Sequence, residues 1–106
     1  MPLEQQRFLD AIGAYEKVTA LEPRDPRTWA GLGSALARAG YADRSAAAYA
    51  RAVTLKPDAP GVQMGYAHVL KTLGDQTAAL AAYRAAVEAK PDFGEAYWSM
   101  ANLKTF

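Results

Sequence analysis

The sequence predicts an all-α fold, a superhelix of antiparallel helix pairs, and three observations support this prediction. The stretch Pro26–Ala59 aligns without a gap with the next stretch, Pro60–Phe93, and each is 34 residues long. Within each stretch apolar residues recur at spacings of three and four, and no segment alternates in the manner of a strand. Glycines and prolines that end helices recur in the same register. Units of this length pack mainly on their neighbours, which produces a solenoid.

The first full unit, residues 26–59, is expected to hold two helices. Asp25 is a suitable N-cap, and Pro26 fits the first turn of a helix, where its missing N–H costs nothing. Gly40 ends that helix because glycine takes the left-handed C-terminal conformation freely. A second helix is expected over residues 42–55 and should end at "KPDAP". The apolar face of the first helix holds Trp29, Leu32, Leu36 and Ala39.

The second full unit, residues 60–93, repeats the same logic, with Gly74 between a first helix and a second helix over residues 76–89. Small residues cluster where helices must touch, and Gly31, Gly33 and Gly65 are interpreted as packing glycines. Larger side chains should fill the gaps between the helices as core residues. These are Trp29, Tyr49, Tyr83 and Tyr97.

The repeat frame extends in both directions and covers the chain as a single domain, residues 1–106. Residues 1–25 form a partial repeat, and the chain is expected to begin late in the first helix of that unit. Residues 94–106 form a second partial repeat, a helix over Gly94–Phe106 without the second helix of its unit. Its apolar side should therefore meet another unit or another chain.

Composition narrows the functional classes. With 12 basic and 11 acidic residues the net charge is +1, which gives no reason to expect nucleic acid as a partner. No run of 18 apolar residues exists, so no membrane partner is expected. The absence of cysteine excludes disulfides and thiolate chemistry and fits a cytoplasmic location. His68 is the single histidine and has no carboxylate close in sequence, so we expect no catalysis, no metal and no cofactor.

These residues resemble the tetratricopeptide repeat, a 34-residue helix–turn–helix with the pattern W-x-x-L-G, then A-x-x-x-F, then proline. The first full unit carries Trp29, Leu32 and Gly33 at the family offsets, with Ser45 where alanine is usual. The second full unit departs at Gln63 and Tyr66, where the family prefers Trp and Leu. The resemblance implies a solenoid fold and a non-catalytic protein–protein interaction function.

The resemblance also implies a concave groove lined by the first helix of each unit. Arg38, His68 and Lys71 would form a basic spot, whereas Trp98 and Met64 would supply apolar contact and Asn102 would hold a peptide backbone. The alternative is that these residues are the solvated side of ordinary repeats. The family positions that clamp a C-terminal carboxylate hold other residues here, so a chaperone-tail binder is not expected. The predicted groove residues are Arg27, Ser34, Arg38, Met64, His68, Lys71, Trp98, Asn102 and Thr105.

The expected partner is a protein or peptide, a downstream domain of the same protein, or a second copy joined through the uncovered terminal helices. The stretch "PDFGEAYWSMANLKTF" is similar to the last repeat of bacterial proteins that join such an array to a sulfotransferase domain. This similarity implies an alternative function as the repeat arm of a larger sulfotransferase, whose catalysis would lie downstream.

Overall fold

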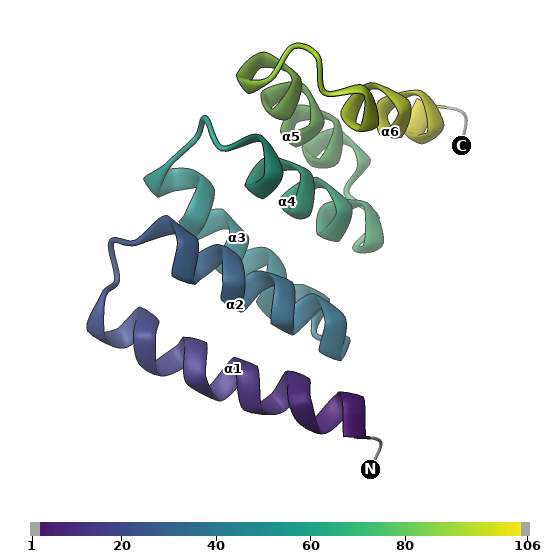
Figure 1. Cartoon of the computed structure of the whole chain (residues 1–106). Coiled ribbons are helices and arrows are strands. Elements are labelled where there is room, and N and C mark those ends of the chain that lie inside the picture. Colours follow the sequence, from purple (N-terminus) through teal and green to yellow (C-terminus); the bar gives the residue numbers. More distant parts are fainter. Residues whose placement is uncertain (1–2, 105–106) are drawn as a thin grey trace.

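The computed structural model describes residues 3–104 as a stack of six α-helices, and no strand occurs among them. The helices follow one another along a curved stack, with α1 at one end and α6 at the other (Figure 1). Neighbouring helices in the sequence are neighbours in space, and α2 also contacts α4. The elements are α1 (Leu3–Leu21), α2 (Pro26–Ala39), α3 (Ala42–Leu55), α4 (Pro60–Thr72), α5 (Gln76–Ala89) and α6 (Gly94–Lys104).

The two full helix pairs confirm the predicted fold class. The side chain of Asp25 caps α2 by accepting a hydrogen bond from the backbone N–H of Arg27. Gly40 follows α2 at φ 95°, and Gly74 follows α4 at φ 85°, a left-handed conformation that favours glycine. The pairs α2–α3 and α4–α5 therefore turn at equivalent positions in the two units.

The N-terminal segment differs from the expectation. Instead of beginning in a first helix that turns into a second one, residues 3–21 form one continuous helix. The turn position that holds Gly40 and Gly74 in the full units holds Gln6 here, so no left-handed residue ends the helix. The additional first turn of α1 contacts the end of α2, where the side chain of Gln5 donates a hydrogen bond to the carbonyl of Ala39 at 3.2 Å.

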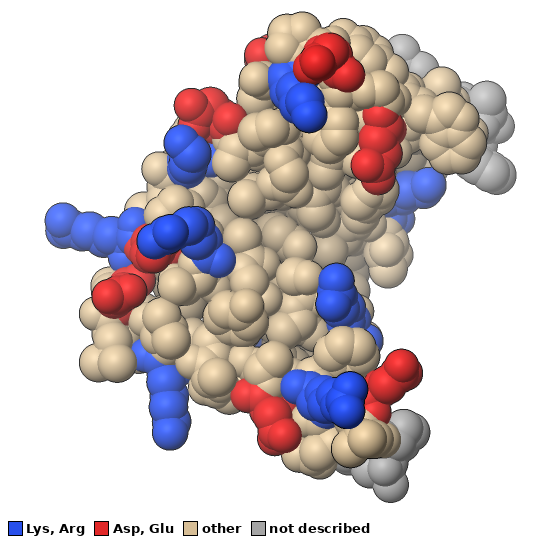
Figure 2. Space-filling view, viewed as in Figure 1, with Lys and Arg blue, Asp and Glu red and all other residues tan. Residues whose placement is uncertain are grey.

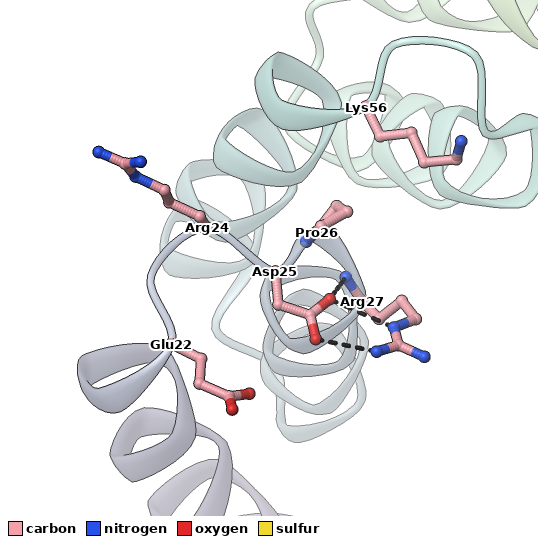
Figure 3. Close-up of a pocket in the computed structure, with 6 residues that line it drawn as sticks. All are labelled: Glu22, Arg24, Asp25, Pro26, Arg27 and Lys56. Atoms are coloured by element: carbon pink, nitrogen blue, oxygen red, sulfur yellow. Dashed lines mark hydrogen bonds and ion pairs between the residues drawn. The ribbon is translucent and has the colours of Figure 1, made fainter.

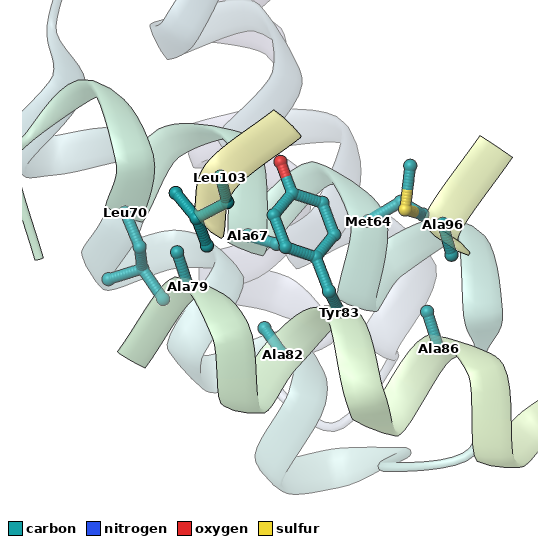
Figure 4. Close-up of a cluster of buried hydrophobic side chains, with 9 residues drawn as sticks. All are labelled: Met64, Ala67, Leu70, Ala79, Ala82, Tyr83, Ala86, Ala96 and Leu103. Atoms are coloured by element: carbon teal, nitrogen blue, oxygen red, sulfur yellow. The ribbon is translucent and has the colours of Figure 1, made fainter. Parts of the chain in front are cut away.

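The core consists of two clusters of buried apolar side chains, one for each half of the stack. The first joins α1, α2 and α3 through Ile12, Leu32, Ala35, Leu36 and Ala48. The second joins α4, α5 and α6, with the ring of Tyr83 surrounded by smaller side chains from all three helices (Figure 4). Most of these partners are alanines, which allow the helices to approach closely enough to enclose one aromatic ring.

Two buried polar side chains are satisfied in ways that explain departures from the family pattern. Ser45 is fully buried, and its hydroxyl donates a 2.6 Å hydrogen bond to the carbonyl of Gly33 in the facing helix. Gln63 occupies the position of Trp29 and makes the same kind of contact with the preceding hinge. Its Nε2 donates to the carbonyl of Pro57 at 2.9 Å, as the indole Nε1 of Trp29 donates to that of Pro23 at 2.8 Å.

The core prediction is wrong at Tyr97, whose side chain is 49% exposed on α6. The equivalent residue, Trp29, is half-buried because Arg51 of α3 lies over its ring, 5.1 Å from the centroid. Among the described residues no second helix covers α6 in this way. The final two residues of the predicted helix, Thr105 and Phe106, lie outside the described residues.

Candidate ligand groove

Tyrosine side chains form the floor between adjacent first helices. Tyr15, Tyr49 and Tyr83 stand at the same position of successive units, 34 residues apart. A Cβ added at Gly31 would lie 2.5 Å from the ring of Tyr15, and one at Gly65 would lie 2.6 Å from the hydroxyl of Tyr49. The tyrosine of each second helix thus reaches the first helix of the next unit, which confirms that these are packing glycines.

The hydroxyl of Tyr83 lies between α4 and α6. It is hydrogen-bonded to Nδ1 of His68 at 3.0 Å, and the two rings meet edge to face. Burial raises the pKa of the Tyr83 hydroxyl, a hydrogen bond with Ser99 lowers it, and the negative charge of Glu95 raises it. The equivalent hydroxyl of Tyr49 has its pKa raised by burial, whereas a hydrogen bond with Ser34 and the charge of Arg38 lower it.

The rim above this floor carries exposed cations. Arg38 lies in the last turn of α2 and Lys71 in the last turn of α4, and both side chains are exposed, as is His68. Three ion pairs occur among the described residues, and none of them includes Arg38 or Lys71. Figure 2 shows the surface hollowed between the α1 and α6 ends of the stack, near the C-terminal ends of α2 and α4, with basic side chains at its edge.

The remaining predicted groove residues divide into three groups. Trp98 is 70% exposed on α6 and is free to contact a ligand, whereas Ser34 and Asn102 are half-buried. Met64 is not on the exposed wall, because its side chain is 5% exposed and belongs to the cluster around Tyr83. Ala96 of α6 packs in the same cluster, so the unit that follows covers Met64 (Figure 4).

Arg27 is not part of the same group as Arg38. It lies in the first turn of α2, next to the hinge, where its guanidinium pairs with the carboxylate of Asp25 at 3.1 Å. This pair lines an open pocket of about 650 Å³ with Glu22, Arg24, Pro26 and Lys56. In Figure 3 the side chains of Arg24 and Lys56 extend away from the pair. The structure therefore separates the predicted residues into a hinge group and a groove group.

The tyrosine hydroxyls are the part of the site that sequence reasoning missed, because Tyr49 and Tyr83 were interpreted only as core residues. Two features of the sequence indicate that these hydroxyls have polar partners. The family pattern has phenylalanine where both units have tyrosine, and a polar residue stands 15 positions earlier in each unit, Ser34 and His68. That spacing places the polar side chain of the first helix against the hydroxyl of the second.

No group of three or more His, Cys, Asp or Glu side chains is arranged to hold a metal ion in residues 3–104. Over the same range, no helix has the length and apolar character needed to cross a membrane.

Comparison with known proteins places the chain in a family. A family model described as tetratricopeptide repeat matches residues 3–60, and a second model with the same description matches residues 61–93. No curated protein matches the sequence. A structure of the MamA protein is 25% identical with a TM-score of 0.87, and the match covers 91% of this chain and 52% of that one. The chain therefore spans about half the length of the MamA structure that it matches.

Two further solved structures share the fold. The first repeat domain of Spaghetti (RPAP3), bound to the HSP90 peptide SRMEEVD, is 20% identical with a TM-score of 0.90, and the match covers 96% of this chain and 81% of that one. The Yersinia enterocolitica type III secretion translocator chaperone SycD is 20% identical with a TM-score of 0.87, over 96% of this chain and 75% of that one.

Proposed function

The chain belongs to the tetratricopeptide repeat family, and from this premise we propose that it is a non-catalytic protein-interaction module that binds a peptide or protein segment in its concave groove. The observation that carries the proposal is the composition of the groove rim. Arg38, Lys71 and His68 are exposed there and form no ion pair among the described residues, and Trp98 exposes an apolar ring on α6. Exposed cations and aromatic rings on rigid helices are typical of surfaces where a few residues dominate binding.

The rigidity of the floor supports this function. The tyrosine hydroxyls hydrogen-bond to the first helix of their own unit, at Ser34 and His68, and Tyr83 also bonds to Ser99 of the next unit, which restrains the helices that carry the rim residues. A preorganised surface loses less conformational entropy on binding. Two solved relatives with the same fold are described as peptide complexes, one with an HSP90 peptide and one with a peptide of the translocator YopD. We extend this mode of binding to the present chain as part of the proposal.

The proposal can be tested with a displayed library of random peptides selected on the immobilised chain. Enriched peptides would be synthesised with a fluorophore and titrated by anisotropy. We expect His68→Ala, Lys71→Ala and Trp98→Ala each to weaken binding about tenfold or more, in the range of interface anchors. Arg84→Ala is the matched control, because Arg84 is exposed on α5, outside the first helices that line the groove.

Enrichment of peptides whose affinity falls with the groove variants but not with Arg84→Ala would support the proposal. If no peptide enriched, or if all four variants bound a selected peptide equally well, groove recognition would be refuted. The similarity of "PDFGEAYWSMANLKTF" to sulfotransferase-associated repeats stays a prediction from sequence alone. None of the similar proteins named above is a sulfotransferase, and no observation in the described residues favours that function. A cytoplasmic location is proposed on the lack of cysteine.

A further inference from the structure

The α6 helix exposes a face that is covered in the other first helices. In α2 and α4 the side facing the second helix is occupied by Gly33 and Ala67, and both are buried. Their equivalent in α6, Ala101, is exposed, and the neighbouring Tyr97 is 49% exposed. The opposite side of α6, with Ala96 and Leu103, is buried against the preceding unit. One side of α6 is therefore packed as in the other units, whereas the other side is open.

The α1 helix exposes the complementary face. It occupies the repeat positions of the second helices α3 and α5, in which four positions are buried in both units. They are Ser45, Ala48, Tyr49 and Ala52 in α3, and Ala79, Ala82, Tyr83 and Ala86 in α5. The equivalents in α1 are not buried: Ala14 is exposed, and Ala11, Tyr15 and Val18 are half-buried. Ile12 and Thr19 of α1 are buried instead, so α1 packs α2 and leaves its other side open.

We propose that the chain associates head to tail with a second copy, the open face of α6 in one molecule receiving the open face of α1 in the next. The contact would rebuild the pair that α2 makes with α3 and α4 makes with α5. The two faces lie at opposite ends of the stack, so a single molecule cannot join them to each other (Figure 1). Each molecule keeps one free face of each kind, and the interface is heterologous.

Two features of the side chains fit a second copy as the occupant. Within the chain, Arg51 of α3 lies over the ring of Trp29 in α2. The residues at the same repeat positions are Lys17 in α1 and Tyr97 in α6, and both are exposed. Pairing α1 with α6 would thus set a cation over an aromatic ring again, a contact that stabilises exposed sites.

The second feature is the size of the facing residues. Ser45 of α3 lies against Gly33 of α2, to whose carbonyl it donates, so both positions require small side chains. The equivalents in the proposed interface are Ala11 of α1 and Ala101 of α6. Small residues on both sides would allow the helices to approach as closely as they do within the chain. The groove face of α6, with Trp98, stays open in this arrangement, so peptide binding and self-association use different surfaces.

Sedimentation velocity of the whole chain, from micromolar to millimolar concentration, tests the proposal. We expect the weight-average mass to rise with concentration above the monomer mass of 11.4 kDa. Ala14→Arg blocks the α1 face and Ala101→Arg blocks the α6 face, and each variant alone should remain monomeric. Both residues are exposed, so neither change should disturb the fold of the monomer, which circular dichroism would verify.

An equimolar mixture of the two variants distinguishes head-to-tail association from other modes. Each variant keeps the face that the other has lost, so the mixture should form a dimer of twice the monomer mass and grow no further. Ala20→Arg is the matched control on α1, because its equivalents Thr54 and Glu88 stay exposed in the complete pairs, and it should associate like the unmodified chain.

Several results would overturn the proposal. A chain that stays monomeric at millimolar concentration would exclude a second copy as the occupant of the α6 face. Association of Ala14→Arg alone would indicate a symmetric α6–α6 contact, and association of Ala101→Arg alone would indicate an α1–α1 contact. A mixture that stays monomeric would also exclude the head-to-tail interface.

Discussion

Replacing Tyr83 with alanine tests the packing argument most directly. The side chain is 0% exposed, so its removal forfeits the free energy that the fold gains by burying its whole apolar surface, and it leaves a cavity. A buried aromatic side chain of roughly 150 Å² at about 25 cal/mol per Å² gives about 4 kcal/mol. The hydrogen bond between its hydroxyl and His68 adds about 1 kcal/mol. We therefore expect Tyr83→Ala to reduce the free energy of unfolding by about 4–5 kcal/mol, in line with other buried aromatic truncations.

Urea denaturation followed by circular dichroism gives this free energy directly. Arg38→Ala is the comparison, because Arg38 is exposed and makes no ion pair among the described residues, and it should change stability by less than about 0.5 kcal/mol. A loss below about 1 kcal/mol for Tyr83→Ala would refute the helix frame. A larger loss for Arg38→Ala than for Tyr83→Ala would refute it as well.

Three further predictions concern the same architecture. Gly65→Ala should lower the free energy of unfolding by about 1–3 kcal/mol in urea melts, because the new Cβ would lie 2.6 Å from the hydroxyl of Tyr49, a side chain only 8% exposed. Gly61→Ala is the control: its Cβ would meet no atom within 4 Å, so the change should be neutral or stabilising. Gln63→Leu should cost about 1 kcal/mol by removing the hydrogen bond to Pro57, and Gln63→Trp should cost less, since Trp29 makes the equivalent bond; equal losses would contradict this account. Burial raises the pKa of Tyr49 and Tyr83, so the fold favours their neutral forms. This stabilisation is present below pH about 10, the pKa of an unfolded tyrosine, and is lost as the pH rises through the pKa values of the folded state. Absorbance at alkaline pH should therefore show two late-ionising tyrosines, one of which disappears in Tyr83→Phe.

The helices were predictable because their signals are local. Asp25 and Gly40 mark the two ends of α2 in the sequence, and the structure has an N-cap and a left-handed residue at those positions. The continuous α1 was missed because the repeat frame was extended to Gln6, where no residue of the right conformation stands. A frame inferred from two complete units describes a third only where the third keeps the residues that end the helix.

The candidate site was less predictable because exposure depends on the neighbouring unit. Met64 and Trp98 occupy the same position of successive first helices, yet Met64 is buried under the next unit and Trp98 is exposed. Arg27 is separated from Arg38 because the two residues lie at opposite ends of α2, and Arg27 pairs there with Asp25 of the hinge. The burial of Met64 and the exposure of Trp98 depend on contacts between helices, which the periodicity within one helix does not contain.

The tyrosines show why the residues that stabilise the fold differ from the residues available to bind a ligand. The ring of Tyr83 fills the core while its hydroxyl bonds to the exposed residue His68, so a change at Tyr83 alters both stability and the support of the groove. The rim residues above it contribute little to packing, since Arg38 and Lys71 are exposed and lack ion pairs in the described structure. Selection for a new ligand can therefore change the rim residues at little cost in stability, whereas replacing the tyrosines of the floor would destabilise the fold. The repeat pattern consequently identifies the fold from the sequence, whereas the identity of the ligand depends on the few rim positions that the pattern leaves unconstrained.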